Sequence, residues 1–346
     1  MAKKTFIIDY DDTLTWNQHD YSYPQIEMIL SCYNKFRKKI PKDHSYPQIK
    51  QAKYLIDNIQ HNAPDVQTII NLQTTNESFE LHNFLEFEFA KSFIKTYENI
   101  CAKALIKTDL SYLKKMFELG EEAWRVYGER TDTYIQETFA KKIINLEVNI
   151  DKEHVKTMGF CMERFPTSFV KTYESLCKEF GFEIKEKEQQ KYYDMGMKAF
   201  SYKRYKEKGF VKGAEEILDF LKKDGNKLML YTKGDKRVQE KKLEAIKIYK
   251  NGEIIRWFDE VHIVDLKSKK QIEELIGSED KNNVYKIGNS IRSDVKPALE
   301  AGIKVIYIPY ETWAYEREHN GLSDEERKRV IEIPKIIDIK KIYQDL

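Results

Sequence analysis

The stretch Phe6-Ile7-Ile8-Asp9-Tyr10-Asp11-Asp12-Thr13 lies near the start of the chain and decides how the rest is interpreted. Its first three residues form a short apolar run of the kind that is buried in parallel sheets. Ligands in open α/β sheets bind at the carboxyl ends of the strands. At such a strand end, Asp9 could be both a nucleophile and a metal ligand, and Asp11 could transfer a proton. The alternative is an acidic turn, because Asp is favoured in turns and at helix N-caps.

The composition limits the class of protein. The chain has 346 residues, enough for a large core and two domains, and its 59 Lys and Arg nearly balance its 57 Asp and Glu. This balance gives no reason to expect nucleic acid as a partner. No apolar stretch approaches the roughly 20 residues that span a bilayer, and neither the cysteines nor the histidines have zinc-ligand spacing. We therefore expect a cytoplasmic protein without a membrane partner; composition does not indicate its oligomeric state.

Two regions of the chain differ in their hydrophobic spacing. Between residues 17 and 209, apolar residues recur at helical spacing, whereas from residue 210 onward short apolar runs alternate with helical segments. The second pattern predicts a parallel sheet with right-handed crossovers. The first strand has no helical partner nearby unless the helical region is skipped. We therefore predict an α/β fold, with a Rossmann-like parallel sheet formed by residues 1–16 and 210–346 and an all-α domain, residues 17–209, inserted after strand one.

Polar residues follow two of the later apolar runs. Thr232-Lys233-Gly234 comes after the first of them, and a hydroxyl followed by backbone N–H groups in a glycine turn can hold a phosphate or an oxyanion. The same residues are also ordinary for a turn between a strand and a helix. Lys267 follows the next run and could neutralise a phosphoryl group. Lysines at this place, Lys270 among them, could equally be a solvated helix start.

A third polar segment begins with Gly288-Asn289-Ser290 and reaches Asp294. An amide oxygen and a carboxylate five residues apart, on a loop that enters a helix, can complete the oxygen-rich shell that Mg²⁺ prefers. Asp294 alone would more simply cap that helix. None of the segments is specific by itself, but their order and their shared place at strand ends are.

This ordered set resembles the haloacid dehalogenase superfamily, whose members are mostly Mg²⁺-dependent phosphatases with an aspartyl nucleophile. The first motif of the superfamily matches Asp9 to Thr13, the second matches Thr232, the third matches Lys267 with Lys270 as the alternative, and the fourth matches Gly288 through Asp294. The likeness is closest to a phosphatase-like branch. In this superfamily an insertion between the first two motifs is a cap domain, and the predicted helical domain occupies that place.

The resemblance implies a mechanism. Asp9 would attack the phosphorus of a small phosphorylated metabolite, and Asp11 would protonate the leaving group and then activate water. The residues that would bind or stabilise the phosphoryl group are Thr232, Lys233, Gly234 and Lys267. The expected ligands of Mg²⁺ are the side chain of Asp9, the main-chain carbonyl of Asp11, and Asn289 and/or Asp294. Because expulsion of halide needs no proton, the second carboxylate favours phosphate esters over dehalogenation.

Asn289 departs from the motif of the superfamily, which usually has Asp there. The change removes one negative charge and keeps an oxygen, so we expect Mg²⁺ binding to be weaker but not abolished. Two alternatives remain open. One is a phosphomutase acting on a sugar phosphate, and the other is a catalytically weak binding or regulatory protein whose helical domain binds a macromolecule.

Overall fold

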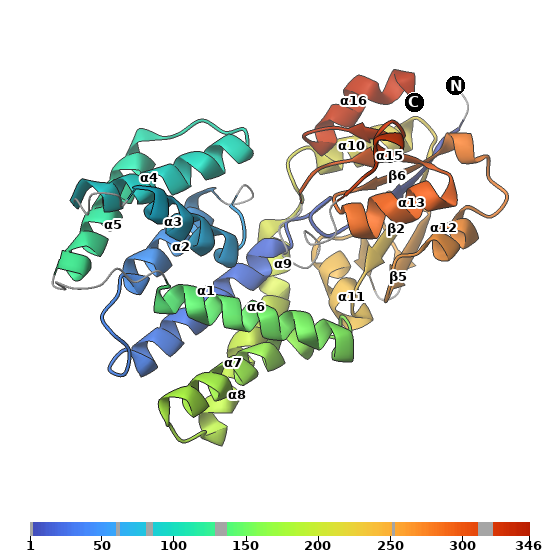
Figure 1. The fold of residues 1–346 in the computed structure, drawn as a ribbon. Coiled ribbons are helices and arrows are strands. Elements are labelled where there is room, and N and C mark those ends of the chain that lie inside the picture. The colour runs from blue at the N-terminus through green and yellow to red at the C-terminus, as the bar shows by residue number, and fades with distance from the viewer. Residues whose placement is uncertain (1–2, 60–62, 81–85, 129–136, 251–252, 311–320) are drawn as a thin grey trace. The chain divides into compact units, whose positions relative to one another are not determined.

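The computed structural model describes residues 3–59, 63–80, 86–128, 137–250, 253–310 and 321–346 (Figure 1). The chain divides into two compact units. The first, here called the core unit, comprises Met1–Gln18, Gly159–Met162 and Phe200–Leu346. The second, here called the helical unit, comprises His19–Met158 and Glu163–Ala199.

The core unit contains a six-stranded sheet in which every neighbouring pair is parallel. Its strands are β1 (Thr5–Ile8), β2 (Lys227–Lys233), β5 (Glu260–Val264), β6 (Val284–Gly288), β7 (Lys304–Tyr307) and β8 (Val330–Glu332), in the spatial order β5-β2-β1-β6-β7-β8. β1 is central, with β2 on one side and β6 on the other. After β5 the chain returns to the middle of the sheet to form β6. The strand order therefore reverses beside β1, which is where open α/β sheets bind ligands.

Helices cover both faces of this sheet because successive side chains of a strand point to opposite sides. Phe6 and Ile8 pack on one face in a cluster with residues of α10 (Ala214–Lys223) and α16 (Ile339–Ile342). Ile7 packs on the other face with residues of α12 (Lys269–Ile276) and α13 (Lys296–Ala301). The other α-helices and strands in the described part of the core unit are α9 (Tyr202–Lys208), α11 (Lys236–Ala245), α15 (Asp324–Arg327) and a small antiparallel pair, β3 (Tyr249–Lys250) with β4 (Glu253–Ile254). The predicted parallel α/β core is confirmed.

The helical unit has no strand among its described residues. Its helices are α1 (Gln18–Phe36), α2 (Ser45–Ile59), α3 (Val66–Glu80), α4 (Glu86–Lys103), α5 (Leu110–Gly128), α6 (Phe139–Met158), α7 (Arg164–Phe180) and α8 (Glu186–Met197). Buried aromatic residues join them; the rings of Tyr173 and Tyr192, for example, stack 4.7 Å apart between α7 and α8. The predicted all-α insertion between the first and second long strands is thus present. No helix in the described ranges has the length and apolar character that a membrane crossing requires.

The borders of the two units differ from the predicted insertion at 17–209. Residues 159–162 and 200–209 belong to the core unit because they bond to it. The Nζ of Lys241 donates to the carbonyl of Phe200 at 3.0 Å, and the N–H of Met162 donates to Asp235 Oδ2 at 3.0 Å. These contacts are between segments far apart in the sequence, so hydrophobic spacing gave no indication of them. The role of the helical unit as a cap stays a prediction.

Candidate active site at the carboxyl ends of the strands

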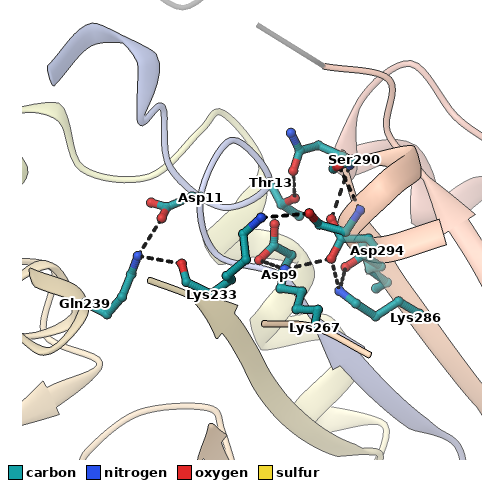
Figure 2. A network of polar contacts seen from close by, with 12 residues as sticks. Asp9, Asp11, Thr13, Lys233, Gln239, Lys267, Lys286, Ser290 and Asp294 are labelled. Carbon is teal, nitrogen blue, oxygen red and sulfur yellow. Dashed lines mark hydrogen bonds and ion pairs between the residues drawn. The ribbon is translucent and has the colours of Figure 1, made fainter. Parts of the chain in front are cut away.

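The carboxyl ends of β1, β2, β5 and β6 carry the polar segments found in the sequence. Asp9 directly follows β1, and its N–H donates to the carbonyl of Ile287 on β6 at 2.9 Å. Asp9 is therefore held against the middle of the sheet by main-chain bonding as well as by its side chain. Figure 2 shows its carboxylate beside Lys267 and Asp294.

Four charged side chains form what we call the charge cluster: Asp9, Lys267, Lys286 and Asp294. The Nζ of Lys267 lies 2.5 Å from Asp9 Oδ1 and 2.7 Å from Asp294 Oδ1, and the Nζ of Lys286 lies 2.8 Å from the same oxygen of Asp294 (Figure 2). All four side chains are buried. Lys270, the alternative to Lys267, is 86% exposed and pairs with Glu274 at 3.7 Å. The structure thus places Lys267, and not Lys270, at the site.

The cluster sets the charge state of Asp9. Burial raises the pKa of Asp9 to about 6, and the negative charge of Asp294 adds to this effect, while the two lysines oppose it. Burial also acts against the charged form of Asp294, but Lys267 and Lys286 outweigh it and hold the pKa of Asp294 well below its ordinary value. Burial tends to lower the pKa of Lys267, and the two carboxylates reverse the shift. At neutral pH Asp9 is therefore mostly ionised, as a nucleophile must be.

Asp294 is an internal residue of a short π-helical turn, Ile291–Val295, and not the cap of a helix. The cap is Ser290, whose main-chain N–H donates to Asp294 Oδ2 at 3.2 Å. Gly288 makes this arrangement possible, because a Cβ at that position would lie 2.3 Å from the Cγ of Asp294. The motif glycine is therefore required by the close approach of the carboxylate.

Asn289 is oriented by two hydrogen bonds. Its Oδ1 accepts from the hydroxyl of Thr13 at 3.2 Å, and its Nδ2 donates to the carbonyl of Tyr310 at 2.7 Å. These bonds tie the end of β1 to the loop after β6. They also direct the amide oxygen, rather than the nitrogen, toward Thr13.

Thr232 lies within β2, which extends past the predicted strand end to Lys233. Its hydroxyl is fully buried and has no hydrogen-bond partner among the described residues. A buried polar group without a partner costs about 1–3 kcal/mol, so this hydroxyl is suited to a ligand oxygen. The N–H of Gly234 donates to Val264 O at 2.9 Å. We predicted that this N–H would be free to donate to a phosphate, but in the structure it is bonded to Val264.

Lys233 points along the same edge of the sheet. Its Nζ donates to the hydroxyl of Ser293 at 3.0 Å and lies 4.3 Å from the ring centre of Phe160. The side chain of Lys233 is thus held between the loop after β6 and residues 159–162. It is positioned as a cation at this edge, in keeping with the predicted binding of a phosphorylated ligand.

The carboxylate of Asp11 points toward α11, away from the charge cluster (Figure 2). It accepts hydrogen bonds from Lys242 Nζ at 2.8 Å and from Gln239 Nε2 at 2.7 Å, and Lys242 also donates to Asn17 Oδ1 at 2.7 Å. Burial raises the pKa of Asp11, but Lys242 and Gln239 outweigh it, so that the pKa lies below its ordinary value. In this conformation Asp11 is an ionised acceptor held by α11.

Three residues of the site were missed by sequence reasoning: Lys286, Gln239 and Lys242. Lys286 could have been identified from the sequence, because a lysine inside the apolar run Val284–Ile287 is unusual for a strand buried on both faces. Gln239 and Lys242 had none, since both lie in a polar helix more than 200 residues from Asp11.

The oxygen atoms at the site fit Mg²⁺ in kind. Asp9 Oδ2 has no hydrogen bond to a described residue, and Asn289 presents an amide oxygen at the end of β6, the strand that pairs with β1. Asp294 fits the role of ligand less well, because both of its oxygens accept from protein donors. In the described part of the chain, no three acidic, histidine or cysteine side chains gather as a metal site. Asp9 is thus the carboxylate of the charge cluster that has an oxygen available for a cation.

No family model and no curated protein matches this chain. Among solved structures, the chain is similar to a haloacid dehalogenase-like family hydrolase from Xanthomonas campestris, with 16% identity over 99% of this chain and 96% of the other and a TM-score of 0.49. It is also similar to a HAD-hydrolase from Bacillus subtilis bound to magnesium (14% identity, 99% and 100% covered, TM-score 0.41). A third is a HAD phosphatase from Thermococcus onnurineus (13% identity, 98% and 97% covered, TM-score 0.38).

Proposed function

We propose that this chain is a phosphatase of the haloacid dehalogenase type, which hydrolyses a small phosphorylated metabolite through an aspartyl-phosphate on Asp9. The observation that carries the proposal is the buried carboxylate of Asp9 at the end of the central strand, paired with Lys267 at 2.5 Å. The neighbouring strand β2 adds the unpartnered hydroxyl of Thr232. A nucleophile, a cation and an unsatisfied hydrogen-bond donor at one edge of the sheet suit transfer of a phosphoryl group.

In the first step, an oxygen of Asp9 forms a bond to phosphorus and the bond from phosphorus to the ester oxygen breaks. Lys267 lowers the repulsion between the carboxylate and the phosphate, and Thr232 donates to a phosphoryl oxygen. Mg²⁺, held by Asp9, the main-chain carbonyl of Asp11 and Asn289, would reduce this repulsion further when bound. In the second step, water attacks phosphorus and the bond to Asp9 breaks, which returns the carboxylate and releases phosphate.

Asp11 is the proton-transfer group of this proposal. In the structure it is held by Lys242 and Gln239, so its side chain has to rotate away from α11 to reach the leaving oxygen. Once it has rotated away from Lys242, Asp11 takes up a proton from solvent and gives it to the leaving alkoxide, and the attacking water later returns a proton to it. Lys242 keeps the resting carboxylate ionised, which suits the second of these transfers.

A panel of phosphorylated metabolites tests the proposal. The full-length protein should release inorganic phosphate from at least one member in the presence of Mg²⁺, and Asp9→Asn should release none. An isomer of a sugar phosphate in place of free phosphate would identify a phosphomutase. No turnover of any member, in a sample whose folding is verified by circular dichroism, would contradict the proposal and favour a binding or regulatory role.

A further inference from the structure

Lys286 is a fully buried cation in the middle of a core strand. Its neighbours in β6 are the apolar Tyr285 and Ile287, and its Nζ donates to Ile287 O at 2.9 Å as well as to Asp294 Oδ1 at 2.8 Å. Burial lowers the pKa of Lys286, and the contact with the carboxylate of Asp294 opposes this shift and favours the charged form. The phosphatase chemistry described above assigns no role to this residue.

The charge cluster is balanced without a metal. Asp9 and Asp294 contribute two negative charges, and Lys267 and Lys286 contribute two positive ones. With Asp at position 289, as in the superfamily motif, and with no cation at position 286, the same site would have three negative charges and one positive, a net charge of −2. Lys286 and Asn289 together therefore change the net charge of the site by the charge of one divalent cation.

We propose that Lys286 supplies, inside the protein, the positive charge that allows this site to bind a phosphate dianion without a divalent cation. The inference rests on the proposed phosphate site. Lys286 neutralises Asp294, which would otherwise share the charge of Lys267 with Asp9. Lys267 still contacts Asp294 at 2.7 Å, but because Lys286 shares the same carboxylate oxygen, more of the positive field of Lys267 acts on Asp9 and on the incoming phosphate. Because the groups are buried, solvent and salt screen them little. Lys286 is thus a positioning residue that acts through Asp294 and Lys267.

Isothermal titration of inorganic phosphate into the full-length protein, in EDTA and in Mg²⁺, tests the proposal without measuring turnover. The wild-type protein should bind phosphate in EDTA with an affinity within about threefold of that in Mg²⁺. Lys286→Met should weaken phosphate binding in EDTA by about tenfold or more, because a low-dielectric site makes the loss of one charge large. Mg²⁺ should restore most of that loss.

Lys4→Met is the matched control. Lys4 is also a buried lysine of the core unit, but it precedes β1, at the amino end of the sheet, and its Nζ lies 4.5 Å from the ring centre of Tyr343. This variant should bind phosphate like the wild type in both buffers. Lys286→Arg, which keeps the charge, should lose less affinity in EDTA than Lys286→Met.

The outcomes separate this inference from the proposed function. Phosphate binding that requires Mg²⁺ in the wild type, or an unchanged affinity of Lys286→Met in EDTA, would overturn the inference and leave the phosphatase proposal intact. Absence of phosphate binding in both buffers would contradict both. If Lys286→Met does not fold, Asn289→Asp replaces it: the added carboxylate should weaken phosphate binding in EDTA by a similar factor, with recovery in Mg²⁺. An unchanged affinity of that variant in EDTA would refute the inference as well.

Discussion

Asp9 is the residue whose chemistry cannot be replaced by its neighbours. Asn has nearly the same shape but is not a nucleophile toward phosphorus, so Asp9→Asn should abolish turnover while leaving the fold intact. Steady-state release of phosphate and the far-ultraviolet circular dichroism spectrum together check this expectation. Residual activity at the wild-type rate would assign the nucleophile to another group.

Asp11→Asn should lower kcat by about 10²–10⁴-fold on an alkyl phosphate, the usual effect of removing a positioned acid–base group. The loss of rate should be smaller on p-nitrophenyl phosphate, because that leaving group departs without a proton. The comparison of the two substrates is the measurement. Equal losses on both would argue that Asp11 holds the structure of the site and does not protonate the leaving oxygen.

The pH profile reports on Asp9. Burial and Asp294 raise its pKa to about 6, and in the proposed mechanism only the ionised form of Asp9 attacks phosphorus. The value of kcat/KM should therefore fall as pH decreases through about 6, roughly tenfold per pH unit further below. In the resting conformation the pKa of Asp11 lies below its ordinary value, because Lys242 and Gln239 outweigh burial, so an acidic limb near pH 6 is assigned to Asp9. An acidic limb near the ordinary pKa of an aspartate would contradict the assignment.

At the scale of elements, the loop from β6 into the π-helical turn is where packing most constrains the sequence. A side chain at Gly288 would overlap the carboxylate of Asp294, so Gly288→Ala should displace Asp294 and reduce activity at least tenfold, with a loss of stability of about 1–3 kcal/mol. Gly321→Ala is the control, because nothing lies within 4 Å of a Cβ built there. Activity and urea unfolding of both variants measure the effect. If Gly288→Ala has the activity and the stability of the wild type, Asp294 can move without loss of either.

The strands could be predicted because each is a short apolar run that ends in polar residues. The same local signal placed Asp9, Thr232 and Lys267 at strand ends, and the structure brings their segments to one edge of the sheet. What could not be predicted depends on pairing across the chain. The N–H of Gly234 is used by Val264 because β2 continues beside β5, and the carboxylate of Asp11 is held by α11. Such partners are more than 25 residues away and leave no periodic pattern.

At the scale of the whole molecule, the stability of the helical unit should depend on pH because of Glu147. This side chain of α6 is buried, with Ser168 and Gln25 donating to it at 2.8 and 2.9 Å, and burial together with Asp151 raises its pKa to about 8. Between the ordinary pKa of a glutamate and about pH 8, Glu147 keeps its proton in the folded unit but releases it in the unfolded chain. The stability from this proton is therefore full below about pH 4.5 and is lost as pH rises through 8.

Glu147→Gln should remove that dependence. Between about pH 5 and 8, the free energy of unfolding should fall more in the wild type than in the variant, by roughly 3–4 kcal/mol. Glu153→Gln, on the exposed side of the same helix, should behave like the wild type. Urea unfolding across this pH range is the measurement, and parallel curves for the wild type and Glu147→Gln would show that Glu147 is ionised in the folded protein.

The division into a parallel core and a helical insertion was also predictable, because the hydrophobic period changes from helical to strand-like near residue 210. The finer borders were not, since residues 159–162 and 200–209 join the core unit through contacts with segments far away in the sequence. The burial of Glu147 could not be predicted from the sequence either, because a glutamate on an amphipathic helix is usually solvated.

The most direct measurement is mass spectrometry of the protein quenched in acid during turnover of a phosphorylated substrate. With p-nitrophenyl phosphate, whose leaving group needs no proton, we expect a phosphoryl group on the peptide that contains Asp9, more of it in Asp11→Asn, whose hydrolysis of the intermediate is slowed, and none in Asp9→Asn. Steady release of phosphate with no adduct on that peptide in any of the three proteins, or with an adduct on another residue, would contradict the account.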